Sequence, residues 1–135
     1  MIVLANDGIS QVGVEKLENN GFKVITTNVA QDQIIDYINR NSITCLLVRS
    51  ATKVRKDIID SCESLKLIGR GGVGMDNIDV EYAKSKGIRV INTPGASSLS
   101  VAELVFAHIM TCSRFLHDSN PVSYTHLRAH ETLPY

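Results

Sequence analysis

Short runs of apolar, often β-branched residues alternate with segments of helical periodicity, and this alternation is the strongest constraint on the fold of the chain. The apolar runs predict strands at Ile2–Ala5, Lys23–Thr26, Cys45–Val48, Leu67–Ile68 and Arg89–Ile91. The intervening periodicity predicts helices at Ser10–Asn19, Gln31–Asn39, Arg55–Ser61 and Asp79–Ser85. Right-handed crossovers place such helices on both faces of a parallel sheet. The sequence therefore predicts an α/β fold with a flavodoxin-like, doubly wound parallel sheet.

Local signals mark several helix ends. Gly21 and Gly87 stand where a left-handed C-cap is expected, and Asp79 suits an N-cap. A longer helix is expected to begin at Ser100, because Glu103 three residues later completes a capping box. This helix has an apolar face, but no sixth strand follows for it to cover.

The composition excludes several function classes. The 135 residues are 44% hydrophobic, which suffices for one compact domain. Fourteen basic side chains balance fourteen acidic ones without long blocks, so we expect no nucleic-acid or membrane partner. The cysteines, Cys45, Cys62 and Cys112, are odd in number and widely spaced, which favours reduced, mostly buried thiols. With no signal segment or membrane span in sight, we expect a soluble, cytoplasmic protein.

The loops that follow the strands contain the candidate binding groups. In an open α/β sheet, ligands bind outside the carboxyl ends of the strands. The segment Arg49–Lys53 offers a guanidinium, two hydroxyls and an ammonium, which suits an anion whose cage backbone amides could complete. The alternative is that these are solvated loop charges. Ser97 and Ser98 follow another predicted strand, where serines are more often turn residues or caps than ligand contacts.

A glycine-rich loop, Gly69–Gly74, has the spacing of a dinucleotide-binding fingerprint. The context disfavours that interpretation, because the next helix begins only near Asp79 and the next strand ends in Asn92-Thr93-Pro94 rather than an acid. The alternative is a loop that lets the backbone approach a ligand closely, with Arg70 offering a cation.

No catalytic or metal constellation is apparent. His108 and His117 fall on the last predicted helix and lack a partner nucleophile or orienting acid. His126 and His130 have a helical i, i+4 spacing, but no third ligand lies nearby. We therefore predict no catalytic residue and no metal site. From Pro121 onward the periodicity disappears, and the residues after it resemble one reading frame of a sequencing adapter.

Taken together, several segments resemble the D-2-hydroxyacid dehydrogenase family, most closely the members that act on 3-phospho-D-glycerate. The similarity spans residues 1–120. It is carried by Arg49–Val54, Leu67–Asp79, Gly87-Ile88, Asn92–Pro94 and Ser100–Leu104.

The resemblance implies a domain organisation. Members of the family have a substrate-binding domain built from both chain ends and a nicotinamide domain inserted between them. By analogy, residues 1–98 would be the first part of the substrate-binding domain, 99–120 an inter-domain helix, and 121–135 a non-native tail. The chain would then be an amino-terminal fragment, and inactive alone, because the family's catalytic histidine, acid and arginine would lie in the missing part.

The resemblance also implies residue roles. By position, Arg49, Ser50 and Arg70 would hold the phosphate and carboxylate of the substrate, together with Gly71, Gly72 and Ser97. Ser97 departs from the asparagine of many relatives. The backbone near Val73 would approach the nicotinamide of NAD.

The implied activity is that of the intact enzyme, expected to be a homo-oligomer. It would oxidise 3-phospho-D-glycerate to 3-phosphohydroxypyruvate, the entry to serine biosynthesis. Two alternatives remain open at this point: a dehydrogenase of another D-2-hydroxy acid, such as glycerate or lactate, and a stand-alone flavodoxin-like module that binds an anion. For the fragment, the uncovered apolar helix predicts aggregation or weak dimerisation.

Overall fold

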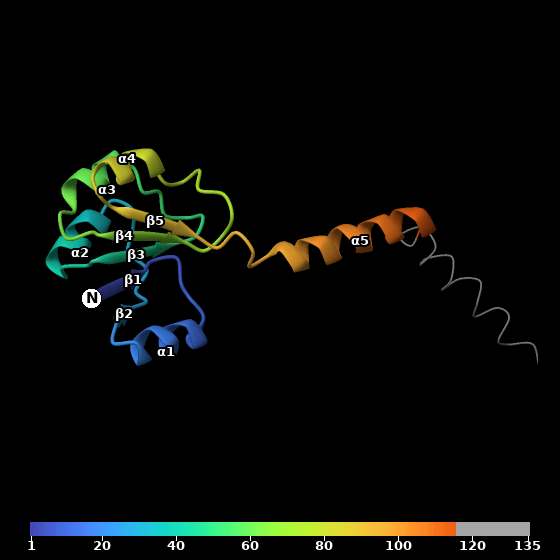
Figure 1. Cartoon of the computed structure of the whole chain (residues 1–135), viewed down its shortest axis with the longest axis horizontal. Helices are drawn as coiled ribbons and strands as arrows, with labels where there is room; N and C mark the ends of the chain where they lie inside the picture. Colours follow the sequence, from blue (N-terminus) through green and yellow to red (C-terminus); the bar gives the residue numbers. More distant parts are fainter. Residues whose placement is uncertain (116–135) are drawn as a thin grey trace, which may run out of the picture. The chain divides into compact units, whose positions relative to one another are not determined.

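The computed structural model describes residues 1–115 and shows alternating strands and helices (Figure 1). The strands are β1 (Ile2–Ala5), β2 (Lys23–Ile25), β3 (Cys45–Val48), β4 (Leu67–Arg70) and β5 (Arg89–Asn92). The helices are α1 (Gln11–Asn19), α2 (Ile34–Arg40), α3 (Lys56–Ser61), α4 (Val80–Ser85) and α5 (Ser98–Arg114). The expected non-native segment, 121–135, lies outside the described residues.

All five strands are parallel and form one sheet in the order β2-β1-β3-β4-β5. The chain moves outward in one direction from β1 to β2 and in the other from β3 to β5, so the order reverses between β1 and β3. This is the flavodoxin-like order, and it confirms the predicted fold class. Ligand sites in such sheets lie at the carboxyl edge, near the reversal.

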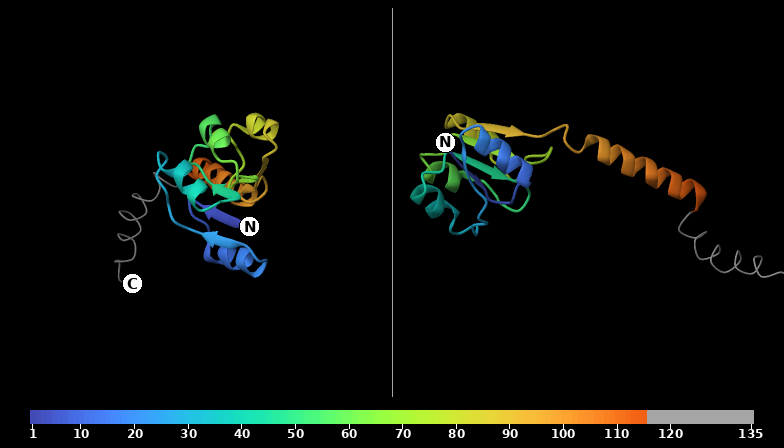
Figure 2. Two further views of the ribbon diagram at one scale, coloured as in Figure 1. Left: turned by 90° about the vertical axis from the view of Figure 1, so that its left-hand side faces the viewer. Right: turned by 90° about the horizontal axis from the view of Figure 1, so that it is seen from below.

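The two faces of the sheet are covered unequally. Right-handed crossovers place α1 on one face and α2, α3 and α4 on the other, as the two views of Figure 2 and Figure 1 together show. The main core lies under the three helices, where Leu4, Leu46 and Ile68 are fully buried. On the α1 side, Ile91 remains 42% exposed, and no helix of residues 1–96 covers the part of the sheet formed by β4 and β5.

Several element ends differ from the prediction. Strand β4 continues through Gly69 and Arg70, because both residues stay in register with β3 on one side and β5 on the other. Central pairing therefore overrides the weak strand preference of glycine. Helix α2 begins at Ile34 rather than at Gln31, after a turn and without a side-chain N-cap hydrogen bond.

The capping predictions gave mixed results. Gly21 and Gly87 adopt φ values of +80° and +77°, which confirms the two left-handed C-caps. Asp79 occupies the N-cap of α4, but its carboxylate pairs with Arg55 instead of capping the helix. The capping box at Ser100 is wrong: α5 already begins at Ser98, so Ser100 lies inside the helix.

The chain divides into two compact units, residues 1–96 and a second unit that begins at Ser97. The described part of the second unit is α5, whose apolar side chains are largely exposed: Leu99, Val101, Leu104, Val105, Phe106, Ile109 and Met110. None of the described helices combines the length and apolar character needed to cross a membrane.

Candidate functional site

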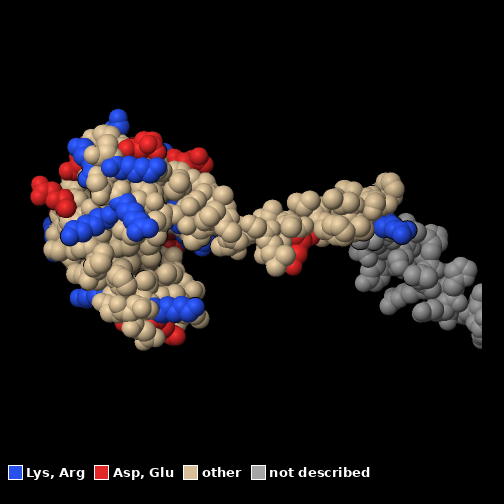
Figure 3. All heavy atoms as spheres, in the orientation of Figure 1, with Lys and Arg blue, Asp and Glu red and all other residues tan. Residues whose placement is uncertain are grey.

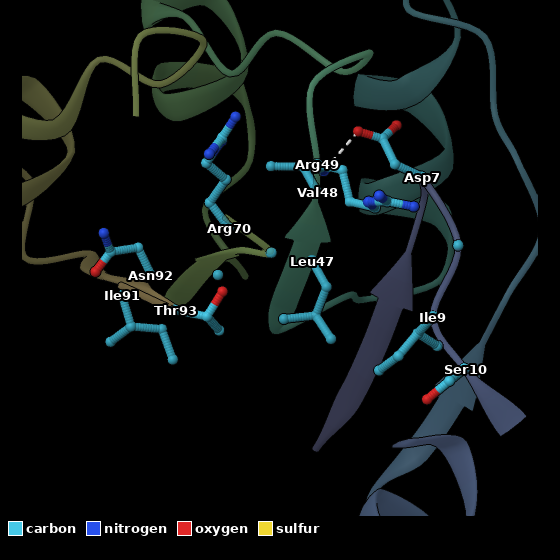
Figure 4. A pocket seen from close by; sticks show the side chains of 13 residues that line it. Asp7, Ile9, Ser10, Leu47, Val48, Arg49, Arg70, Ile91, Asn92 and Thr93 are labelled. Carbon is cyan, nitrogen blue, oxygen red and sulfur yellow. Dashed lines mark hydrogen bonds between the residues drawn. The ribbon is translucent and has the colours of Figure 1, made fainter. Parts of the chain in front are cut away.

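A pocket of about 640 Å³ opens at the carboxyl edge of the sheet (Figure 4). It is lined by residues 7–10, 47–49, 69–71 and 91–93, which belong to the ends of β1, β3, β4 and β5 and the loops that follow. Leu47, Gly69 and Ile91 lie side by side in the register of three neighbouring strands and form an apolar floor. The polar groups come from the last residues of the strands and from the loops that follow, as expected for a ligand site in this fold.

The 49–52 loop, which follows β3, is held by two side chains from other parts of the chain. The Asp7 carboxylate accepts hydrogen bonds from the backbone N–H of Arg49 at 2.6 Å and of Thr52 at 3.1 Å. The Asn77 side-chain amide donates to the carbonyl oxygens of Arg49 at 2.9 Å and of Thr52 at 2.7 Å. The prediction that backbone amides complete an anion cage is therefore wrong for Arg49 and Thr52, whose amides already bind Asp7. The exposed side chains of Arg49 and Ser50 remain available to a ligand.

Arg70, the last residue of β4, lines the same pocket. Its Nε atom is buried and has no hydrogen-bond partner among the described residues. The guanidinium lies against Gly72, where a Cβ atom would overlap Nη1. A side chain at position 72 would displace the guanidinium, and the φ of +155° at this residue also favours glycine. Buried N–H groups are normally hydrogen-bonded, so this arginine is a candidate ligand contact.

The loop after β4 is tied to the end of β5. The N–H of Gly72 donates to Thr93 Oγ1 at 2.9 Å, and the N–H of Thr93 donates back to the Gly72 carbonyl at 3.1 Å. Asn92 Nδ2 donates to the Val73 carbonyl at 2.6 Å. Helix α4 begins only at Val80, so the glycine spacing does not place a helix N-terminus at the loop. The structure agrees with the prediction that this is not a dinucleotide fingerprint.

The structure brings several of the predicted site residues together at one pocket. Arg49, Arg70 and Gly71 line the pocket, and Gly72 lies directly after them in the chain. Ser97 is exposed and belongs to the second compact unit. Asp7 and Asn77 were not predicted. The position of Asp7, directly after the strand beside the order reversal, is the signal that could have identified it.

The carboxylate of Asp7 stays ionised in this setting. Burial, the largest single cause, acts to raise the pKa of Asp7, but the hydrogen bonds from the Thr52 hydroxyl and from the backbone of Arg49, Thr52 and Ala51 outweigh it. Together they hold the pKa below its usual value of 3.8.

Charge elsewhere on the surface is mixed. On the face shown in Figure 3, basic and acidic side chains are interspersed over residues 1–96. The formal net charge of the chain is zero. Attraction of an anion to the pocket therefore depends on the local guanidinium groups.

The thiols and histidines provide no reactive centre within the described residues. Burial raises the pKa values of Cys45 and Cys62 to about 11, so both remain protonated, whereas Cys112 is exposed on α5. His108 is exposed on α5. Within residues 1–115, no three His, Cys, Asp or Glu side chains gather as metal ligands. His117, His126 and His130 lie outside the described residues.

Sequence comparison identifies relatives of known function. Residues 2–128 match the family model of the D-isomer specific 2-hydroxyacid dehydrogenase catalytic domain. D-3-phosphoglycerate dehydrogenase of Methanocaldococcus jannaschii is 42% identical over 112 residues, which are 83% of this chain and 21% of that enzyme. Hydroxypyruvate reductase of Thermotoga maritima is 43% identical over 115 residues, 84% of this chain and 37% of the relative. The chain thus spans between about a fifth and two fifths of the length of these relatives.

Solved structures agree with this assignment. The NAD+-bound 3-phosphoglycerate dehydrogenase of Entamoeba histolytica superposes with a TM-score of 0.65 at 32% identity, covering 82% of this chain and 38% of that enzyme. D-lactate dehydrogenase of Aquifex aeolicus, complexed with NAD and lactic acid, superposes with a TM-score of 0.64 at 25% identity, covering 92% and 38%. The chain therefore belongs to the D-isomer specific 2-hydroxyacid dehydrogenase family.

Proposed function

We propose that the pocket at the carboxyl edge of the sheet binds a phosphorylated D-2-hydroxy acid through Arg49, Ser50 and Arg70. The observation that carries this proposal is the buried Arg70 Nε, which lacks a partner among the described residues at the wall of a pocket that Arg49 also lines. An oxygen of a carboxylate or phosphate would satisfy that N–H with a charge-assisted hydrogen bond.

Two arginines at one pocket favour a substrate with more than one anionic group. A guanidinium matches the oxygens of a carboxylate or phosphate in two-pronged geometry. 3-Phospho-D-glycerate carries both groups, one at each end of a three-carbon chain. Arg49 and Arg70 come from the ends of neighbouring strands, so each could hold one end of the molecule. Ser50 would add a hydroxyl to the contacts of Arg49.

For the complete enzyme, we propose oxidation of 3-phospho-D-glycerate to 3-phosphohydroxypyruvate, the entry to serine biosynthesis. NAD supplies the hydride acceptor for carbon 2 of the substrate. Among the described residues, Val73 fits the cofactor side of the site: it is 52% exposed in the loop beside Arg70, and Asn92 fixes its carbonyl. The part played by residues 1–115 is to bind and orient the substrate. We assign no catalytic role to any histidine of this chain.

A second candidate is a dehydrogenase of an unphosphorylated 2-hydroxy acid. The 43% identity with a hydroxypyruvate reductase favours it, since that identity is as high as the one with D-3-phosphoglycerate dehydrogenase. This candidate leaves one of the two arginines without an anionic group to hold. In either case we propose a cytoplasmic enzyme that is a homo-oligomer when complete, with α5 as the connection between its domains.

Calorimetric titration of the chain with 3-phospho-D-glycerate, D-glycerate, D-lactate and inorganic phosphate tests the proposal. We expect the phosphorylated acid to bind most tightly. Arg49→Ala and Arg70→Ala should each lower its affinity by about tenfold or more, because each removes a charge-assisted hydrogen bond. Arg40→Ala is the matched control, since Arg40 ends α2 at the opposite edge of the sheet, where the chain enters β3, and pairs with Asp36.

Three results would contradict the proposal. The phosphorylated acid could bind no better than D-glycerate, which would favour the second candidate. The two pocket variants could bind like wild type, or Arg40→Ala could weaken binding as much as they do.

A further inference from the structure

We propose that Asp7 and Asn77 are positioning residues that clamp the 49–52 loop so that Arg49 and Ser50 face the substrate. This inference rests on the proposed function, because it assigns these two residues a part in binding the same anion. Neither residue is expected to contact the reacting atoms. Their effect is transmitted through the backbone of the loop.

The Asp7 side of the clamp satisfies the N–H groups of the loop. Oδ2 of Asp7 accepts from the backbone N–H groups of Arg49 and Thr52. Oδ1 accepts from the hydroxyl of Thr52 at 2.5 Å. The residues that meet here lie more than forty positions apart in the chain. Charge-assisted hydrogen bonds of this kind are stronger than neutral ones, so they hold the loop in one conformation.

The Asn77 side of the clamp satisfies the carbonyl groups. Its amide donates to the carbonyl oxygens of Arg49 and Thr52, and so spans the loop from its first residue to its last. Asn77 is itself fixed, because the N–H of Val54 donates to its backbone carbonyl at 2.8 Å. Val54 also forms a parallel bridge with Ile78. The loop is therefore held between two fixed side chains.

A buried polar network supports the clamp from below. Asn6, only 3% exposed, donates through Nδ2 to Thr52 Oγ1 at 2.8 Å and to the carbonyl of Val29 at 3.1 Å. Its Oδ1 accepts from the N–H of Val29 at 2.8 Å. Because each of these buried groups has a partner, moving Thr52 would leave several of them unsatisfied. The network fixes the far end of the loop.

A positioning role of Asp7 and a purely electrostatic role predict opposite effects of neutralising its charge on anion binding. Asp7 lines the same pocket as Arg49 and Arg70, so its negative charge opposes the binding of an anion there. If Asp7 acted only through its charge, neutralising it would strengthen anion binding. If Asp7 holds the loop, neutralising it weakens binding, because the amide of an asparagine cannot replace both acceptor oxygens. The sign of the change separates the two roles.

The test measures the affinity of the full chain for 3-phospho-D-glycerate, at a temperature well below the unfolding transition of each variant. Asp7→Asn and Asn77→Ala should each weaken binding by about tenfold. Asp7→Asn makes the hydrogen bonds from the two backbone N–H groups neutral and replaces the acceptor of the Thr52 hydroxyl by an NH2 group, and Asn77→Ala removes both hydrogen bonds to the loop carbonyls. The control Asp32→Asn removes the same charge from an exposed turn before α2, and it should leave affinity unchanged. In an Arg49→Ala background, Asp7→Asn should add less than about a twofold further loss, because coupled residues are not additive.

Amide hydrogen exchange provides a readout that needs no ligand. The amides of Arg49 and Thr52 should be protected in the wild type and exchange faster in Asp7→Asn, while amides of β3 stay protected. Asn77→Ala provides an independent route if Asp7→Asn does not fold. Equal or tighter binding by Asp7→Asn, unprotected amides in the wild type, or fully additive losses would overturn the clamp. An Arg49→Ala variant that binds like wild type would instead overturn the proposed function. In that case, the amide hydrogen exchange of Asp7→Asn would still show whether Asp7 holds the loop.

Discussion

Replacing Arg70 by methionine should stabilise the ligand-free chain. The arginine keeps a buried Nε–H without a partner among the described residues. An unsatisfied buried N–H costs about 1–3 kcal/mol. Methionine retains an apolar stem of similar length and has no polar hydrogen to satisfy, so little packing is lost. We expect the free energy of unfolding to rise by about 1 kcal/mol, the lower end of that range.

Urea and thermal unfolding followed by circular dichroism measure the change. A gain of about 1 kcal/mol corresponds to a rise in the midpoint of roughly 4–8 °C for a domain of this size. Saturating 3-phospho-D-glycerate should reverse the order of stability. At a hundred times the wild-type dissociation constant, the ligand stabilises the wild type by about 2.7 kcal/mol and a variant that binds tenfold more weakly by about 1.4 kcal/mol. The difference of about 1.3 kcal/mol exceeds the gain expected for the ligand-free variant.

Arg55→Met is the matched control, because this second arginine has its partners. Its Nη1 pairs with Asp79 at 2.8 Å and its Nη2 donates to the Asp76 carbonyl at 2.9 Å. The pair is partly exposed, so we expect a loss of stability of at most about 1 kcal/mol. If Arg70→Met destabilised the ligand-free chain as much as Arg55→Met, Arg70 would be a structural residue and the argument from its unpaired Nε would fail.

Three further predictions concern other parts of the chain. Gly87→Ala should lower the free energy of unfolding in urea by about 1–2 kcal/mol, because φ is +77° at this residue. Gly95→Ala is the control and should be nearly neutral, because Gly95 also has open space around it but no positive φ. Equal effects of the two changes would contradict this prediction. Because the pKa of Asp7 is lower in the folded chain than its usual 3.8, the ionised Asp7 carboxylate stabilises the folded state. This contribution to the free energy of unfolding is complete above pH 3.8 and is lost as the pH falls through the folded-state pKa. The unfolding free energy of the wild type should therefore decline more steeply below about pH 4 than that of Asp7→Asn, and parallel pH profiles would refute the assignment. The exposed side chains of Leu104 and Phe106 on α5, 58% and 63% accessible, should promote self-association of the chain. Sedimentation velocity should detect this association, and replacing both residues by glutamine should reduce it. A wild-type chain that stays monomeric at all concentrations would contradict the prediction.

The strands and their order could be predicted because the signal is local. Each apolar run is bounded by turn residues, and handedness then leaves few topologies. The end of β4 could not be predicted, since Gly69 joins the sheet only because β3 and β5 lie on either side of it. The capping box at Ser100 failed for the opposite reason: a locally plausible signal was overridden when the helix began two residues earlier.

The sequence predicted the cationic side chains of the candidate site, but not the side chains that hold its loop in place. Arg49 and Arg70 stand at the ends of predicted strands, where a ligand site is expected. The roles of Asp7 and Asn77 depend on partners 42 and 28 positions away along the chain, which no local pattern indicates. For the same reason, the sequence suggested that backbone amides were available to an anion, although the chain's own carboxylate already binds them.

The central claim is that Arg49 and Arg70 each hold an anionic group of the substrate. Its most direct test follows the side-chain Nε–H signals of the arginines by NMR while 3-phospho-D-glycerate is added to the labelled chain. We predict that the Arg70 and Arg49 signals shift and saturate together, while that of Arg40 stays in place. An Arg70 signal that does not move while the ligand binds elsewhere would contradict the account.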